Sequence, residues 1–158
     1  MRGSRALSVE QVTVGAERVS ALVRIAEGRP LRTPAYPDLV PAVRTILPGL
    51  ARHRCDSGSA HGIFAELDDT ELPHLLEHVA LELMALAGSP RSLRGDTAWD
   101  FAADGHGVFR VSLEYDDDLV ALGALREGAA IVNALLEGDA DSVDIASATA
   151  RLSAVRQG

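Results

Sequence analysis

The amino-acid sequence predicts an α+β fold in which a small antiparallel sheet packs against helices. Strand-like alternation and helix-like periodicity both occur, but they do not alternate regularly enough for a doubly wound parallel sheet. The 158 residues are 47% hydrophobic, which is enough for one domain with a substantial core. Aromatic residues make up only 4% of the chain, so Leu, Val, Ile and Ala must fill that core.

Two regular elements are predicted before residue 54. The alternating pattern of Ser20–Ala26 predicts a strand that ends before Gly28. A helix is predicted from Leu39 to about His53, with Asp38 as its N-cap. Pro48 lies inside this helical pattern, and it should kink or split the helix because proline has no backbone N–H.

The sequence from Cys55 onward predicts loops that alternate with helices and strands. We expect a turn-rich loop at Cys55–Gly62, a short strand at Ile63–Leu67, a helix capped by Asp69 or Thr70 that ends near Ala87, a long loop at Ser89–Gly107, a strand at Val108–Tyr115, a helix at Asp117–Leu136 and a weakly anchored helix at Val143–Val155. The chain is predicted to be a single domain, residues 1–158, with peripheral segments at 1–19 and 140–158.

The residues from His74 to His78 spell H-x-x-E-H, the inverted zinc-peptidase motif. At 3.6 residues per turn, the two histidines lie one above the other on one face of a helix. Two imidazoles at this spacing can bind one Zn²⁺, and Glu77 lies where a general base is needed. The alternative is a surface helix that carries two histidines by chance, since so short a motif recurs often.

The helix that carries the motif has two covered faces. One stripe is apolar and should face the core: Leu72, Leu75, Leu76, Val79, Leu83 and Leu86. The opposite side carries the motif and continues with Leu81, Met84 and Ala85 rather than with charged residues. This pattern predicts that the motif borders a partly closed pocket.

A catalytic zinc site needs a third protein ligand. Our first choice is Glu114, because Phe109, Val111 and Leu113 should face the core and leave Glu114 on the polar face of the strand. The other candidates are Glu82, Glu127, Asp104 and His106. Glu82 could instead hydrogen-bond one of the metal-binding side chains without contacting the metal. Arg94 and Arg110 are candidates for binding a substrate carboxylate.

Charge and cysteine content limit the partners and the compartment. The net charge of −8 argues against binding nucleic acid. Cys55 is the only cysteine, so no internal disulfide forms and a reducing compartment, the cytoplasm, is expected. No apolar run approaches the roughly 20 residues of a membrane span, so we expect no membrane association.

Several runs resemble the N-terminal domain of cyanophycin synthetases. They are Glu77–Leu83 continuing to Leu86–Gly88, Leu47–Leu50 followed by His53–Cys55 and Gly58, and Gly107–Phe109 with Leu113–Tyr115, which is similar to the family's Gly-Val-Tyr…Phe-Glu-Tyr strand. The resemblance covers roughly residues 30–137. It implies binding of cyanophycin, a polymer with an aspartate backbone and arginine in isopeptide linkage, and in some members its metallopeptidase-like cleavage into short primers. By resemblance, His74, Glu77 and His78 form the hydrolytic cluster, with Glu114 in the Phe-Glu-Tyr position.

Two segments depart from the pattern of that family. The Gly-Thr-Trp-Leu-Gly lead-in is Asp69–Pro73 here, and the Gly-Arg-Thr-Arg-Glu-Thr-like loop is Leu93–Thr97. We expect both segments to line the path of the substrate. Their change points either to a different substrate or to the loss of catalysis.

The leading hypothesis is therefore a zinc-dependent hydrolase that cleaves peptide or isopeptide bonds in Asp- and Arg-rich, cyanophycin-like substrates. The alternative is a non-catalytic binding module that docks an amide polymer or a separate ligase subunit. The chain has no lysine and no phosphate-binding loop, so we expect no ATP-driven ligation by this chain alone. The identity of the metal, the scissile bond and the oligomeric state, a homo-oligomer included, stay open.

Overall fold

The computed structural model describes residues 5–53 and 62–156. Its strands are β1 (Leu7–Val14), β2 (Arg18–Ile25), β3 (Gly95–Trp99) and β4 (Val108–Glu114). Its α-helices are α1 (Leu39–Ile46), α2 (Ile63–Leu67), α3 (Leu72–Leu86), α4 (Phe101–Asp104), α5 (Asp118–Leu136) and α6 (Ile145–Val155), with short 3₁₀ helices η1 (Thr33–Ala35), η2 (Pro48–Arg52) and η3 (Ala140–Ser142).

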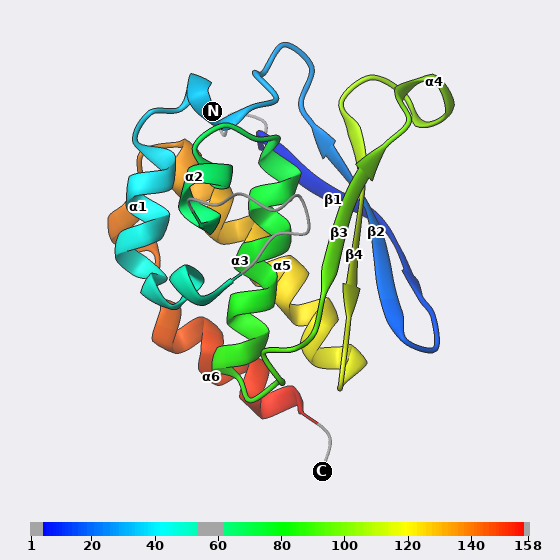
Figure 1. The fold of residues 1–158 in the computed structure, drawn as a ribbon, viewed down its shortest axis with the longest axis vertical. Helices are drawn as coiled ribbons and strands as arrows, with labels where there is room; N and C mark the ends of the chain where they lie inside the picture. The colour runs from blue at the N-terminus through cyan, green and yellow to red at the C-terminus, as the bar shows by residue number, and fades with distance from the viewer. Residues whose placement is uncertain (1–4, 54–61, 157–158) are drawn as a thin grey trace.

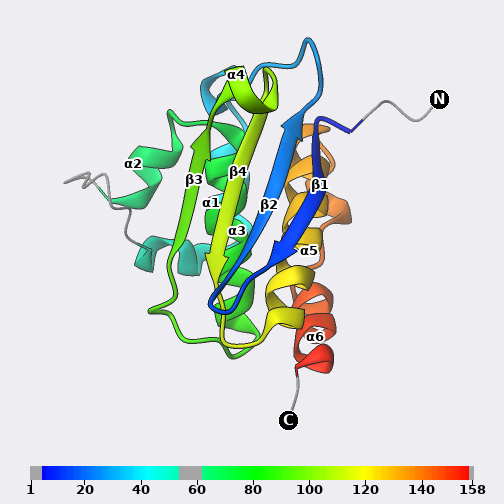
Figure 2. The same ribbon diagram turned by 90° about the vertical axis from the view of Figure 1, so that its right-hand side faces the viewer.

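The strands form one antiparallel sheet in the order β1-β2-β4-β3, and the long helices cover one face of it (Figures 1 and 2). On that face β4 buries Phe109, Val111 and Leu113, as the alternation of the sequence predicts. The predicted α+β class and antiparallel sheet are confirmed. The other face of the sheet points to solvent and carries polar side chains such as Arg110 and Glu114.

Most predicted helices lie where the sequence places them. Pro48 splits the first one into α1 and η2, and α3 ends before Gly88, whose φ of 104° a residue with a side chain rarely adopts. The residue before α3 is Glu71, and it makes no side-chain capping bond, so the cap predicted at Asp69 or Thr70 is wrong. Asp117 caps α5 by accepting from the backbone N–H groups of its first turn.

Three predictions of regular structure are wrong. Ile63–Leu67 is a helix, because its buried residues Ile63, Phe64 and Leu67 follow the spacing of a helix turn. The predicted loop at Ser89–Gly107 contains β3 and α4, which are short and mostly exposed and so lack an apolar period. No strand was expected at Leu7–Val14, yet β1 forms one edge of the sheet with its second half exposed.

The two long helices form the layer behind the sheet. α3 packs against α5 and against β3 and β4, and its other side meets η2. α5 is long and apolar enough, by length and composition, to cross a membrane, although the sequence was expected to hold no such run. Its contacts with α3, β1 and α6 account for this apolar character, and half of the apolar stretch is buried inside the protein.

The C-terminal helix α6 packs Ala148 and Leu152 into the core. Arg151 forms a double hydrogen bond to Glu127 of α5, and Arg156 donates to the carbonyl of Ala87. These contacts dock the helix that the sequence predicts to be weakly anchored. Of the predicted loop Cys55–Gly62, only Gly62 lies within the described residues, so Cys55 is outside them.

Candidate metal centre

The motif helix α3 is buried on both of its faces. Leu75, Leu76 and Val79 are fully buried against the core, and Glu77 and His78 are only 4% and 3% exposed. Burying two ionisable side chains costs free energy, because charged and polar groups lose their hydration. The two-sided helix predicted from the sequence is therefore confirmed except at Leu86, which is exposed at the end of the helix, and the polar side of α3 is an interior site.

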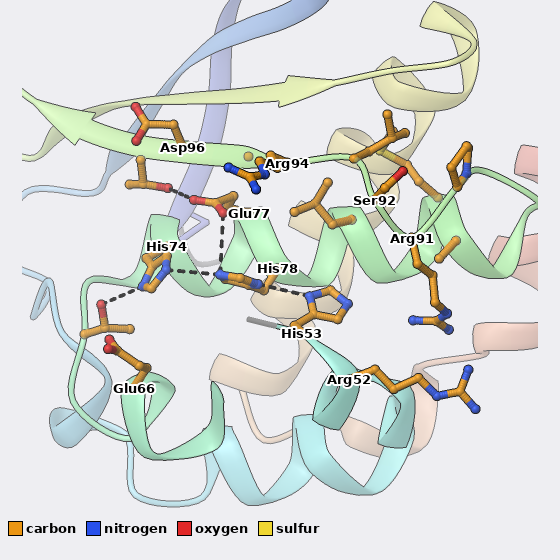
Figure 3. Close-up of a pocket in the computed structure, with 18 of the residues that line it drawn as sticks. Arg52, His53, Glu66, His74, Glu77, His78, Arg91, Ser92, Arg94 and Asp96 are labelled. Atoms are coloured by element: carbon orange, nitrogen blue, oxygen red, sulfur yellow. Dashed lines mark hydrogen bonds and ion pairs between the residues drawn. The ribbon is translucent and has the colours of Figure 1, made fainter. Parts of the chain in front are cut away.

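The functional atoms of His74, Glu77 and His78 converge on one point (Figure 3). The two Nε2 atoms are 3.2 Å apart, and Glu77 Oε2 is 3.5 Å from His78 Nε2. All three candidate ligand atoms lie within 4.8 Å of one another. Tetrahedral zinc with bonds of about 2.0–2.1 Å to nitrogen separates its ligand atoms by about 3.3 Å, so the spacing of the two imidazoles fits this metal.

Hydrogen bonds at the outer nitrogens fix which atoms of the rings face the centre. The Thr70 hydroxyl donates to Glu71 Oε2, so its oxygen is left to accept from His74 Nδ1, which is 2.9 Å away. His78 Nδ1 is 3.0 Å from Nδ1 of His53. With Nδ1 protonated in both rings, the two Nε2 lone pairs face each other and would bind a cation.

Burial keeps both histidines uncharged. It lowers the pKa of His78 to about 3, with further lowering from the neighbouring His74 and His53. It also lowers the pKa of His74, against the opposing effect of the carboxylates of Glu66, Glu71 and Asp96. Neutral imidazole is the form that binds metals, so the site holds its histidines ready for a cation near neutral pH.

Glu77 is held by the edge strand β3. The Thr97 hydroxyl donates to Glu77 Oε1 at 2.8 Å, which leaves Oε2 toward His78. Gly95 makes room for this arrangement, because a Cβ at this position would lie 2.7–2.9 Å from the Glu77 side chain. Sequence reasoning put Gly95 and Thr97 in a segment expected to line the substrate path, but it missed their contacts with Glu77 because β3 was predicted to be part of a loop.

A cavity of about 960 Å³ opens above the three residues. It is lined by Thr70 and Glu71 from one of the segments that depart from the pattern of the resembled family, and by Leu93 to Thr97 from the other. The expectation that both segments border the site agrees with this lining. Arg94 also lines the cavity (Figure 3), and its role in binding a substrate carboxylate stays a prediction.

The structure does not bring Glu114 to the histidines, which corrects the first choice for a third ligand. The alternation of β4 does put Glu114 on the polar face, but α3 packs against the opposite face of the sheet. Glu114 instead accepts from the backbone N–H of Arg94 at 2.7 Å and lies 3.7 Å from Arg18. Among the described residues, Glu77 supplies the carboxylate oxygen that lies within 4.8 Å of both imidazole nitrogens.

The remaining candidates also lie outside the cluster. Glu127 binds Arg151, His106 meets the ring of Phe101 edge to face, and Asp104 forms a double hydrogen bond with Arg110. Arg110 therefore points from the outer face of the sheet, away from the cavity, which corrects its expected role in substrate binding. Glu82 is close to the site, but it binds His53 and Arg91 rather than the centre.

Fold and site together define an α+β domain with a buried His-Glu-His cluster beneath a cavity. Residues 22–137 match the cyanophycin synthase-like N-terminal domain. This match spans 116 of the 158 residues, counted from 22 to 137, and the chain therefore belongs to that family. No curated protein matches the chain.

Proposed function

We propose that this domain is a zinc-dependent hydrolase that cleaves peptide or isopeptide bonds in Asp- and Arg-rich, cyanophycin-like substrates. The observation that carries the proposal is the convergence of two imidazole lone pairs and one carboxylate at the floor of a large cavity. Membership in the family supports the choice of substrate. We also propose the cytoplasm as the location, since the chain has a single cysteine and so cannot form an internal disulfide.

His74 and His78 would hold the metal through their Nε2 atoms, with Glu77 beside them. A bound zinc ion would supply Lewis-acid activation of water and of the scissile carbonyl. The two imidazole nitrogens fit zinc, because imidazole is a common zinc ligand, and Glu77 would act beside them as a base rather than as a ligand.

Glu77 is the proposed general base. Its Oε1 accepts from the Thr97 hydroxyl, and its Oε2 lies 3.5 Å from His78 Nε2, on the side where the reacting water would lie. This carboxylate would accept a proton from the water and pass it to the leaving nitrogen. Arg94 and Arg52 line the cavity and would bind carboxylates of the substrate through their guanidinium groups.

A binding module without catalysis is the second candidate function. The observation that favours it is that both segments that differ from the family pattern line the cavity, so recognition and cleavage need not have been kept together. Such a module would hold an amide polymer, or dock a separate ligase subunit, through the same cavity. It would bind its polymer equally well after His78→Ala.

The substitution Glu77→Gln tests the enzyme proposal. We expect hydrolysis of cyanophycin to fall by about 10²–10⁴-fold, because the amide cannot accept the proton, while the zinc content stays unchanged. The control is Glu127→Gln, which changes a buried glutamate outside the cavity and should keep full activity. Retained turnover in Glu77→Gln would contradict the general-base role. A wild type that binds the polymer but contains no zinc and has no activity would favour the binding module.

A further inference from the structure

We propose that His53 is a positioning residue of the metal centre. Held by Glu82 and Arg91, it fixes the ring of His78 so that Nε2 is unprotonated and faces the metal. The metal part of this inference rests on the proposed function. The state of the His78 ring can be measured without metal, so the inference and the proposed function can fail separately.

The contacts form one continuous chain of polar groups. Arg91 binds both carboxylate oxygens of Glu82, at 2.8 and 3.2 Å, and Glu82 Oε1 lies 3.0 Å from His53 Nε2. Burial alone would raise the pKa of Glu82, but the hydrogen bonds from His53 and Arg91 outweigh it and hold the pKa below its ordinary value. The ionised carboxylate only accepts, so His53 Nε2 must donate to it.

The direction of this bond sets the direction of the next one. With its proton on Nε2 directed at Glu82, the His53 ring can accept at Nδ1, which lies 3.0 Å from His78 Nδ1. His78 Nδ1 must then donate, and its Nε2 is left as the lone pair directed at His74 and Glu77. This is the ring state that a metal ligand needs.

The backbone next to His53 is shaped for the same contact. An added Cβ at Gly49 would lie 2.1 Å from Glu82 Oε2, so only glycine lets the carboxylate lie against η2. Pro48 ends α1 and starts η2, and η2 brings His53 across to α3. The Leu-Pro-Gly-Leu run and the following histidine therefore have a common physical role, which the hydrolytic cluster alone does not explain.

The chain offers a matched control for this arrangement. Glu127 forms the same kind of double hydrogen bond to Arg151, at 2.7 and 2.9 Å, and is also buried, but within the described residues it hydrogen-bonds to no histidine. Glu82→Gln and Glu127→Gln each break one Glu–Arg pair. Only the first also weakens the acceptor of His53.

The first experiment measures zinc affinity of the full chain by competition with a chromophoric chelator. We expect His53→Phe and Glu82→Gln to weaken zinc binding by about 10–100-fold, and Glu127→Gln to leave it unchanged. Gly49→Ala should weaken binding as well, although it removes no hydrogen-bonding group, because it displaces the Glu82 carboxylate. Unchanged affinity in all three variants, with zinc bound by the wild type, would overturn the positioning role.

The second experiment is ¹⁵N NMR of the imidazoles in the metal-free protein. We expect His78 to carry its proton on Nδ1 in the wild type and in Glu127→Gln, and to move toward a mixture of the two tautomers in His53→Phe. A wild-type His78 protonated on Nε2 would overturn the inference. A wild type that binds no zinc but shows the Nδ1–H ring would sink the hydrolase proposal and leave the role of His53 supported.

Discussion

Two neutral histidines in the interior make the stability of the metal-free protein depend on pH. His78 has an ordinary pKa near 6.5 when the chain is unfolded and a pKa of about 3 in the folded protein. Below pH 6.5 the unfolded state therefore binds a proton that the folded state does not. Stability is fully present above pH 6.5 and is lost as the pH falls toward 3.

We expect the free energy of unfolding of the metal-free protein to fall by about 1.4 kcal/mol per pH unit, for one such histidine, between pH 6.5 and 5. Most carboxylates titrate below this window, so histidines account for the slope. Urea denaturation at several pH values measures it. His78→Gln should flatten the slope, whereas removal of the exposed His106 should not; equal stability at pH 7 and 5 would contradict the burial of neutral rings.

Gly95 is expected to be essential for the position of Glu77. Gly95→Ala puts a methyl group within 3 Å of that side chain and forces it or β3 to move. We predict a cost of about 1–3 kcal/mol in stability and a larger, at least tenfold, loss of hydrolysis, with zinc still bound. Ala98→Val, on the exposed side of the same strand, is the control, and an active Gly95→Ala enzyme would show that Glu77 is not held by this contact.

Among single residues, the sequence predicts His74, Glu77 and His78 because all three lie within two turns of one helix. It does not predict the partners of these residues. His53 and Glu82 are 29 positions apart in the chain, and Thr97 comes from a strand with no apolar pattern. Such contacts depend on how the elements pack, which no local period encodes.

The elements with clear periodicity are the ones that could be predicted. The helix α3, the helix α5 and the strand β4 are each long enough, with enough buried residues, for their period to be read. β3 is an edge strand with mostly exposed side chains, so its sequence carries little alternation. β1 is an edge strand whose alternation is interrupted by a register shift between Val9 and Gln11. The choice of Glu114 failed for a related reason: the alternation of β4 is correct, but it does not say which face α3 covers.

α6 is expected to contribute to stability through one residue above all. Leu152 is 1% exposed and approaches α5 at Gly123, where an added Cβ would lie 2.6 Å from Leu152 Cδ2. We predict that Leu152→Ala lowers the free energy of unfolding by about 2–5 kcal/mol, measured by chemical denaturation. Val155→Ala, in the same helix but exposed, should change it by less than about 0.5 kcal/mol; equal effects of the two would mean that α6 does not pack into the core.

In the whole molecule, the cavity lies between the edge strand β3 and the segment η2, and the buried face of α3 forms its floor. The sheet and α5 support α3 from behind. The metal-binding histidines come from α3, and the residues that hydrogen-bond to the site come from η2 and β3. Binding of a metal should therefore stabilise the whole fold. At a zinc concentration 100 times the dissociation constant, the expected gain is about 2.7 kcal/mol.

The zinc content of the purified chain tests the central claim most directly. Elemental analysis after dialysis against limiting free zinc should find one equivalent per chain in the wild type. His74→Ala and His78→Ala should each lose it while keeping the circular dichroism spectrum of the folded protein. A folded wild type that retains no zinc under these conditions, or variants that retain the full equivalent, would contradict the assignment of this cluster as a metal centre.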